Sequence, residues 1–141
     1  MFREDPHTSN PFDEQVYRML HANLADVPEL LGAVLLSDDG LPKSSFGFDR
    51  ETVEHLAAAG TGYASLGRGL ATSIDGGPLL HSVVKMVDRT LIITNCGEGS
   101  TIVVVTGARA DMGAVMYEVL RVAKAVGDFM GTKPRADVRA T

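Results

Sequence analysis

The architecture of this chain follows from one segment, Gly32-Ala33-Val34-Leu35-Leu36-Ser37-Asp38-Asp39-Gly40-Leu41-Pro42-Lys43-Ser44-Ser45. The uninterrupted apolar run from Ala33 to Leu36 is typical of a strand that is covered on both faces. Asp39-Gly40 between two strand-like runs indicates a hairpin, because glycine adopts a positive φ without steric cost. Pro42 has no N–H to donate to a neighbouring strand, so we predict that the second strand lies at a sheet edge.

Length and charge restrict the kinds of partner. The 141 residues predict one domain over 11–130, with an arm over 1–10 and a tail over 131–141. The net charge of −5 and the lack of a Lys/Arg run argue against nucleic acid and anionic membranes. The single cysteine, Cys96, suits a reducing compartment, and no apolar run is long enough for membrane insertion. Because the N-terminus also lacks the pattern of a secretion signal, we expect a cytoplasmic protein.

Periodicity predicts the remaining elements. Apolar residues at helical spacing indicate three helices, over 11–25, 50–72 and 112–130. Between the last two helices, three strand-like segments lie over 78–87, 90–95 and 101–106, and their short turns imply antiparallel pairing. The last of these strands is apolar throughout, which indicates a central position, whereas the mixed polarity of 78–87 indicates an edge strand.

The second predicted helix, which Asp49 is placed to cap, has two apolar stripes. One, the small stripe, consists of Val53, Ala57, Gly60, Ala64, Gly67 and Ala71, and the other, the large stripe, consists of Leu56, Ala59, Tyr63, Leu66 and Leu70. The four glycines of this helix cost about 3–4 kcal/mol relative to alanine, which predicts a close approach to another element. Either the small stripe packs on the sheet, or it meets its own copy across a twofold axis while the large stripe fills the core.

Catalytic and metal-binding patterns are not found in the sequence. A phosphate-binding loop is missing, and the glycines of 60–69 follow no strand, so no nucleotide or other cofactor is expected. Gly40 and Pro42 occupy positions where a calcium loop needs side-chain oxygens. The four histidines have no ligand spacing, and we interpret His81 and Cys96 as structural rather than catalytic residues. We therefore expect no enzyme activity, no catalytic residues and no metal site.

The order of elements, the hairpin Gly32–Pro42 and the Ala/Gly-rich second helix together resemble the Roadblock/dynein light-chain family, and within it the bacterial MglB-type members. The resemblance covers about residues 12–130. It implies an α/β (α+β) three-layer sandwich with a five-stranded antiparallel sheet of order 2-1-5-4-3, one helix on one face and two on the other. It also implies a homodimer in which the third strands pair and the second helices lie together.

The same resemblance implies a non-catalytic regulator or adaptor of a small Ras-like GTPase, in a bacterial cytoplasm. The dimer interface expected from the small stripe and the third strand consists of Gly60, Ala64, Gly67, Ala71, Leu80, Ser82 and Val84. The remaining face of the second helix, the polar flank, is the hypothetical GTPase-binding surface and consists of Arg50, Glu54, Thr61, Ser65, Arg68 and Thr72. The alternative function is a small-molecule sensor module of the PAS/GAF kind, which needs an internal cavity that the low aromatic content disfavours.

Overall fold

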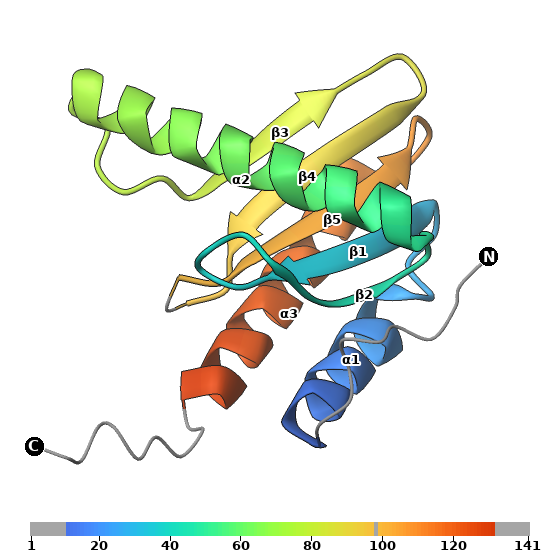
Figure 1. Ribbon diagram of the computed structural model, residues 1–141. Coiled ribbons are helices and arrows are strands. Elements are labelled where there is room, and N and C mark those ends of the chain that lie inside the picture. The colour runs from blue at the N-terminus through green and yellow to red at the C-terminus, as the bar shows by residue number, and fades with distance from the viewer. Residues whose placement is uncertain (1–10, 98, 132–141) are drawn as a thin grey trace, which may run out of the picture.

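The computed structural model describes residues 11–97 and 99–131 and shows a five-stranded sheet between two layers of helices (Figure 1). The elements in chain order are α1 (Pro11–Leu24), β1 (Leu30–Leu36), β2 (Pro42–Phe46), α2 (Arg50–Ser73), β3 (His81–Lys85), β4 (Arg89–Asn95), β5 (Thr101–Gly107) and α3 (Met112–Gly131). All strand pairs are antiparallel, and the spatial order is β2-β1-β5-β4-β3. Helix α2 covers one face, and α1 and α3 cover the other (Figure 1). The predicted fold is confirmed.

The hairpin between β1 and β2 forms as its sequence predicts. Gly40 has a φ of +84°, and its N–H donates to the Ser37 carbonyl at 3.0 Å. The Ser37 hydroxyl donates to the Asp39 carboxylate, so a side-chain hydrogen bond also stabilises the turn. Pro42 begins β2, which pairs only with β1 among the described strands, so the predicted edge position of this strand is confirmed.

Two apolar clusters lie on the two faces of the sheet, because side chains alternate along each buried strand. In β5, all seven residues are buried. The cluster under α1 and α3 includes Val16, Leu20, Leu24, Leu35, Ile92, Ile102, Val104, Val115, Val119 and Val126. The cluster under α2 includes Val34, Leu36, Val53, Ala57, Ala64, Leu91, Ile93, Val103 and Val105. The sheet is therefore covered on both faces at its centre, as the apolar strands predict.

Helix α2 begins where its sequence predicts. The Asp49 side chain accepts a hydrogen bond from the Thr52 N–H at 2.9 Å, which is the geometry of an N-cap. Hydrogen bonds from the backbone and the side chain of Thr52 hold the pKa of the Asp49 carboxyl below its usual value. Helix α2 is therefore anchored at the end that follows β2.

Strand β3 is shorter than the predicted segment 78–87. Met86 and Val87 belong to the turn before β4, where the Met86 N–H donates to the Arg89 carbonyl at 2.8 Å. Pro78 precedes the strand and has no N–H for a ladder. The predicted arm over 1–10 lies outside the described residues, as does the predicted tail apart from Gly131, which ends α3.

Candidate partner-binding surfaces

Helix α2 turns its small stripe toward the sheet of its own chain. Gly60 and Ala64 are buried, and a Cβ built on Gly60 would lie 2.5 Å from Cγ2 of Val103. A Cβ on Gly67 would lie 2.8 Å from Cδ2 of Leu79. The Ala71 carbonyl accepts the Gly76 N–H at 2.8 Å. Gly60 and Ala64 are therefore buried inside the chain, whereas Gly67 and Ala71 are half-buried. The packing favours the interpretation in which the small stripe faces the sheet, and the role of these four residues in a dimer interface stays a prediction.

The large stripe, which one of the two interpretations places in the core, is largely exposed. Leu66 is 72% exposed and Leu70 is 60% exposed, and Tyr63 and Ile74 are also open to solvent. Only Leu56, near the start of the helix, packs against the cluster under α2. The physical reason is the short distance between helix and sheet, which only glycine, alanine and valine can accommodate at the contact. The bulkier stripe is therefore displaced to the side of the helix.

Strand β3 forms the other edge of the sheet, as predicted. Among the described strands it pairs only with β4. Ser82 and Val84 lie opposite Ile93 and Leu91, so they share the face that α2 covers, and both are half-buried. Leu80, just before the strand, is 73% exposed. The exposed apolar patch, defined as Tyr63, Leu66, Leu70, Ile74 and Leu80, thus lies beside an open sheet edge.

The polar flank lies on the other side of the buried small stripe from the large stripe, as 100° per residue requires. All six of its residues, Arg50, Glu54, Thr61, Ser65, Arg68 and Thr72, are exposed. The hydroxyl of Thr61 donates to the Ala57 carbonyl at 2.8 Å, and that of Thr72 donates to the Arg68 carbonyl at 3.2 Å. The predicted exposure of this face is confirmed, and its role in GTPase binding stays a prediction.

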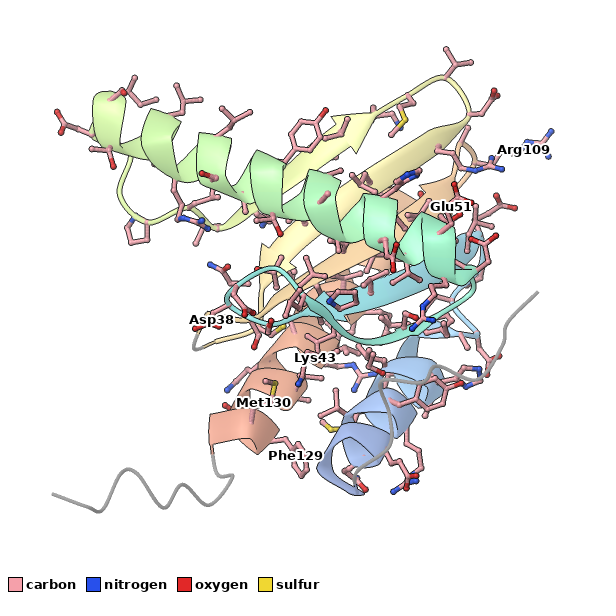
Figure 2. All side chains as sticks on the ribbon, viewed as in Figure 1. Asp38, Lys43, Glu51, Arg109, Phe129 and Met130 are labelled. Atoms are coloured by element: carbon pink, nitrogen blue, oxygen red, sulfur yellow. The ribbon has the colours of Figure 1, made fainter. Side chains whose placement is uncertain are left out.

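A cleft of about 310 Å³ lies beside the polar flank. The β1–β2 turn, the β4–β5 turn and the middle of α2 enclose it, and Thr61 and Arg68 are the two polar-flank residues that line it. Asp38, at the tip of the β1–β2 turn (Figure 2), and Asn95, at the end of β4, complete its polar lining from distant parts of the sequence. In the sequence, Asp38 is expected only as part of the hairpin turn, and Asn95 is not among the predicted site residues.

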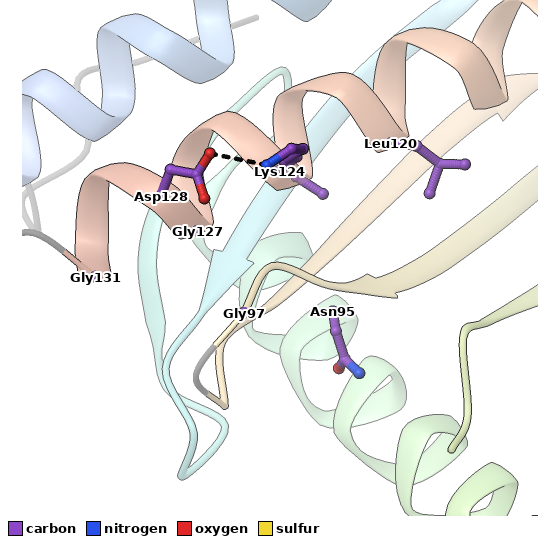
Figure 3. Close-up of a pocket in the computed structure, with 8 residues that line it drawn as sticks. Asn95, Gly97, Leu120, Lys124, Gly127, Asp128 and Gly131 are labelled. Atoms are coloured by element: carbon purple, nitrogen blue, oxygen red, sulfur yellow. Dashed lines mark hydrogen bonds and ion pairs between the residues drawn. The ribbon is translucent and has the colours of Figure 1, made fainter. Parts of the chain in front are cut away.

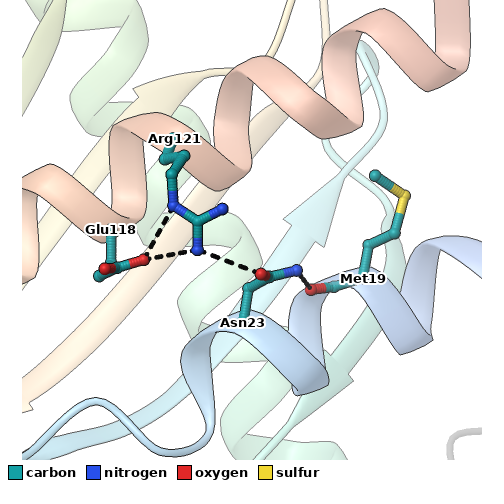
Figure 4. A network of polar contacts seen from close by, with 4 residues as sticks. All are labelled: Met19, Asn23, Glu118 and Arg121. Atoms are coloured by element: carbon teal, nitrogen blue, oxygen red, sulfur yellow. Dashed lines mark hydrogen bonds and ion pairs between the residues drawn. The ribbon is translucent and has the colours of Figure 1, made fainter.

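A network of polar side chains lies in the layer of α1 and α3, on the other face of the sheet. Arg121 on α3 pairs with Glu118 at 2.7 Å and donates to the Asn23 side chain of α1 at 3.2 Å (Figure 4). Asn23 in turn donates to the Met19 carbonyl at 2.7 Å, so this network joins α1 to α3. Because its charged groups are partly exposed, the ion pair contributes no more than about 1 kcal/mol.

A groove of about 660 Å³ runs beside the C-terminal half of α3 (Figure 3). Lys124 and Asp128 pair at 3.1 Å on its wall. At Gly127 the helix approaches the β4–β5 turn so closely that a Cβ would lie 2.6 Å from the Cys96 carbonyl. Cys96 itself is buried, and burial raises the pKa of its thiol to about 12. The thiolate that nucleophilic chemistry requires is therefore strongly disfavoured.

Metal-binding clusters and membrane-spanning helices are absent from the described residues. Residues 11–97 and 99–131 bring no three Asp, Glu, His or Cys side chains together in a way that could hold a metal ion. Within the same ranges, no helix combines the length and apolar composition that a transmembrane span needs.

Comparison with known proteins gives the relatives of this fold. Residues 16–106 match the family model of the Roadblock/LC7 domain. A Roadblock/LC7 domain structure from Streptomyces avermitilis is 33% identical, with a TM-score of 0.78, and the match covers 82% of this chain and 98% of that chain. MglB of Myxococcus xanthus is 18% identical, with a TM-score of 0.75 over 84% of this chain and 96% of that chain. The gliding protein MglB from Thermus thermophilus is also 18% identical, with a TM-score of 0.76 over 85% of this chain and 91% of that chain. None of the curated proteins compared with the chain matches it. Because the family model spans more than half of the sequence, the chain belongs to the Roadblock/LC7 domain family.

Proposed function

We propose that this protein is a non-catalytic homodimer that binds a small Ras-like GTPase and regulates it or links it to other proteins. One observation carries the proposal: the exposed apolar patch, which extends from α2 to Leu80 just before β3, adjoins the open sheet edge at β3. Exposed apolar side chains next to unpaired strand groups are a site for pairing with another chain. A second copy of this chain supplies the same strand and the same patch, so it covers both at once.

The register of the proposed β3–β3 pair follows from symmetry. Antiparallel pairing about a twofold axis perpendicular to the sheet places one residue opposite itself and keeps both copies of α2 on the same face. With Val83 on the axis, Ser82 lies opposite Val84 of the partner subunit. Leu80 then lies opposite Met86 of the partner subunit. This register buries exposed apolar groups at both ends of the strand, since Leu80 and Met86 are each about half or more exposed in the single chain.

In this dimer the large stripe replaces the small stripe as the helix part of the interface. Leu66 and Leu70 extend from the side of α2 that is farther from the polar flank, and each copy meets the corresponding stripe of the other. Burying a leucine side chain of this exposure contributes about 1.5–3 kcal/mol. The strand residues Leu80, Ser82 and Val84 keep their place in the proposed interface.

The polar flank remains the proposed GTPase-binding surface. It is exposed along its whole length, it is of mixed polarity, and it includes arginines, which are enriched at the energetic centres of protein interfaces. Because the flank lies on the far side of α2 from the large stripe, each protomer carries a separate copy away from the twofold axis.

The sensor alternative requires a ligand cavity inside the fold. At Gly60 the helix lies so close to Val103 that an added Cβ would overlap it, so the space between α2 and the sheet is closed at that point. This packing favours the adaptor function over a PAS/GAF-like internal site.

The dimer is tested by light scattering at micromolar concentration. The wild-type chain is expected at twice the mass of the monomer, and Leu66→Asp is expected to be monomeric with an unchanged circular dichroism spectrum. Leu41→Asp is the matched control, because Leu41 is 59% exposed but lies at the β1–β2 turn. A monomeric wild type, or a dimer that Leu66→Asp leaves intact, would overturn the proposed interface.

GTPase binding is tested with purified small Ras-like GTPases of the source organism, loaded with GTP or GDP. Arg68→Glu should weaken binding at least tenfold without lowering stability, since an exposed helix position tolerates substitution. Lys124→Glu is the control, because its side chain is 79% exposed on α3 in the opposite layer. If Lys124→Glu weakens binding and Arg68→Glu does not, the site lies on the α1 and α3 face. If the wild type binds none of the GTPases in either state, the function itself is refuted.

A further inference from the structure

The cleft beside the polar flank is built by close contacts between three elements. Gly40 lies against Thr61, since a Cβ at this glycine would come 2.8 Å from the Thr61 hydroxyl. Gly99 lies against Asp38 in the same way, since a Cβ at this glycine would come 2.8 Å from the Cβ of Asp38. Both glycines have positive φ, so other residues would be strained there as well as crowded. The two turns and the helix are thereby held together, and the cleft of about 310 Å³ is left between them.

The lining of this cleft combines an apolar floor with a polar rim. Leu36 and Ala64, both buried, contribute the floor. Asp38, Arg68 and Asn95 contribute exposed polar groups around it. The Thr61 hydroxyl donates its proton to the Ala57 carbonyl, so its oxygen is available to accept a hydrogen bond. The site therefore offers an anion, a cation and neutral polar groups within one small volume.

The two charges of the rim lack partners in the described part of the chain. Across residues 11–97 and 99–131, the ion pairs are those of Arg121 with Glu118 and of Lys124 with Asp128. Neither the Asp38 carboxylate nor the Arg68 guanidinium makes a side-chain hydrogen bond within those ranges. A ligand that neutralises both groups would gain two charge-assisted contacts without breaking an existing one.

We propose that this cleft binds a small zwitterion of the size of a free α-amino acid. Arg68 holds the ligand carboxylate, since its planar guanidinium matches a carboxylate with two parallel hydrogen bonds. Asp38 accepts from the ligand ammonium. Asn95 and the Thr61 oxygen lie in the same cleft, where they hydrogen-bond the polar backbone of the ligand, and its side chain lies over Leu36 and Ala64.

The charge balance of the cleft separates this ligand from simpler ones. Among the described residues of the lining, a divalent cation would meet a single carboxylate and would be repelled by Arg68, whereas such ions take several oxygen ligands. A phosphate would pair with the Arg68 guanidinium but would be repelled by the Asp38 carboxylate. A zwitterion is attracted at both ends, so it satisfies the lining that is present.

This inference does not depend on a GTPase, although Arg68 belongs to both surfaces. The experiment therefore uses the full-length protein alone. Titration calorimetry and amide chemical shifts are recorded with each of the twenty standard amino acids, with inorganic phosphate as a second probe. We expect at least one amino acid to bind and to shift the amide signals of Gly40, Gly97 and Gly99, which line the cleft. The titration is then repeated with the N-acetyl derivative and with the methyl ester of the best ligand, each of which has lost one charge.

Two variants test which residue binds the carboxylate and which binds the ammonium of the ligand. Arg68→Gln should weaken binding of the amino acid at least tenfold, and Asp38→Asn should remove the preference for the amino acid over its N-acetyl derivative. The controls are Arg50→Gln and Glu54→Gln, which lie on the polar flank outside the cleft lining and should bind as the wild type does. Absence of binding by all twenty amino acids at millimolar concentration overturns the proposal. Equal weakening by the cleft variants and the controls, or phosphate binding without amino-acid binding, also overturns it.

Discussion

The contact between α2 and the sheet can be tested with two glycines that lie two residues apart. Gly60 is buried against Val103, whereas a Cβ on Gly62 would have no heavy atom within 4 Å. Both positions are interior to the same helix, so Gly→Ala gives each the same gain in helix propensity, about 1 kcal/mol. The two substitutions differ only in what the new methyl group meets.

At Gly60 the new Cβ would lie 2.5 Å from Cγ2 of Val103. Val103 is fully buried in the central strand β5, and its branched side chain is short, so it has little freedom to move aside. Overpacking of this kind costs about 1–3 kcal/mol. When the gain in helix propensity is subtracted from this cost, we expect Gly60→Ala to lower the free energy of unfolding by between zero and about 2 kcal/mol. Gly62→Ala should raise it by about 1 kcal/mol.

The measurement is the free energy of unfolding from urea titrations followed by circular dichroism, at one protein concentration because dimerisation contributes to stability. Melting temperatures should separate in the same order, by roughly 3–5 °C per kcal/mol for a chain of this size. Gly60→Leu extends the test, since a larger side chain should be worse at this position. Equal responses of Gly60 and Gly62 would show that α2 does not pack on the sheet through its small stripe.

The other predictions concern positions outside this contact. After the same gain in helix propensity, Gly127→Ala should lose between zero and about 2 kcal/mol of stability in urea titrations because its Cβ would meet the Cys96 carbonyl, whereas Gly131→Ala, which has open space, should not be destabilised. Cys96 should react with a thiol reagent at pH 8 at least a hundredfold more slowly in the native protein than in urea, because it is buried with a thiol pKa of about 12. Asp49→Ala should lower the melting temperature at pH 7. Since the pKa of this cap is depressed in the folded state, that difference should persist above about pH 4 and vanish as the pH falls through the folded-state pKa.

Much of the fold could be predicted because its signals are local. The turn at Asp39-Gly40, the cap at Asp49 and the apolar run of β5 each act within a few residues, and the structure confirms all three. The predicted edge positions of β2 and β3 are also confirmed. The strand order came from the family resemblance, since periodicity gives the number of strands but does not give their neighbours.

The orientation of α2 could not be deduced in the same way. On a helical wheel the large stripe is the more apolar face, which favours it as core. The structure buries the small stripe instead because Gly60 brings the backbone within contact of Val103, and the distance between layers is a tertiary quantity. Neighbouring glycines and alanines at helical spacing were the available signal. In a helix with an exposed apolar stripe beside them, they mark the sheet-facing side, and the large residues mark the side left for a partner.

The candidate sites were harder still to predict, because residues far apart in sequence build them. The cleft joins Asp38, Thr61, Arg68 and Asn95 from a turn, a helix and the end of a strand, and only their meeting in the fold gives the site its charge balance. In sequence, Asp38 belongs to a hairpin turn and Asn95 ends a strand, and both positions are common for these residue types. Neither therefore indicates a ligand before the fold is known.

The arrangement of α2 makes folding and assembly separable in this protein. Gly60, Leu66 and Arg68 lie within nine residues, yet they face the sheet, the open side and the cleft. A substitution at Gly60 acts on packing inside one chain, so its effect on stability should persist in a monomeric Leu66→Asp background. A substitution at Leu66 acts between chains, so its effect on stability should grow with protein concentration, as mass action requires. Because the two residues contact different groups, their effects within the monomer should add to within about 0.5 kcal/mol. A larger deviation would mean that the small stripe and the large stripe form one cooperative surface, and that the closed contact with the sheet depends on the partner chain.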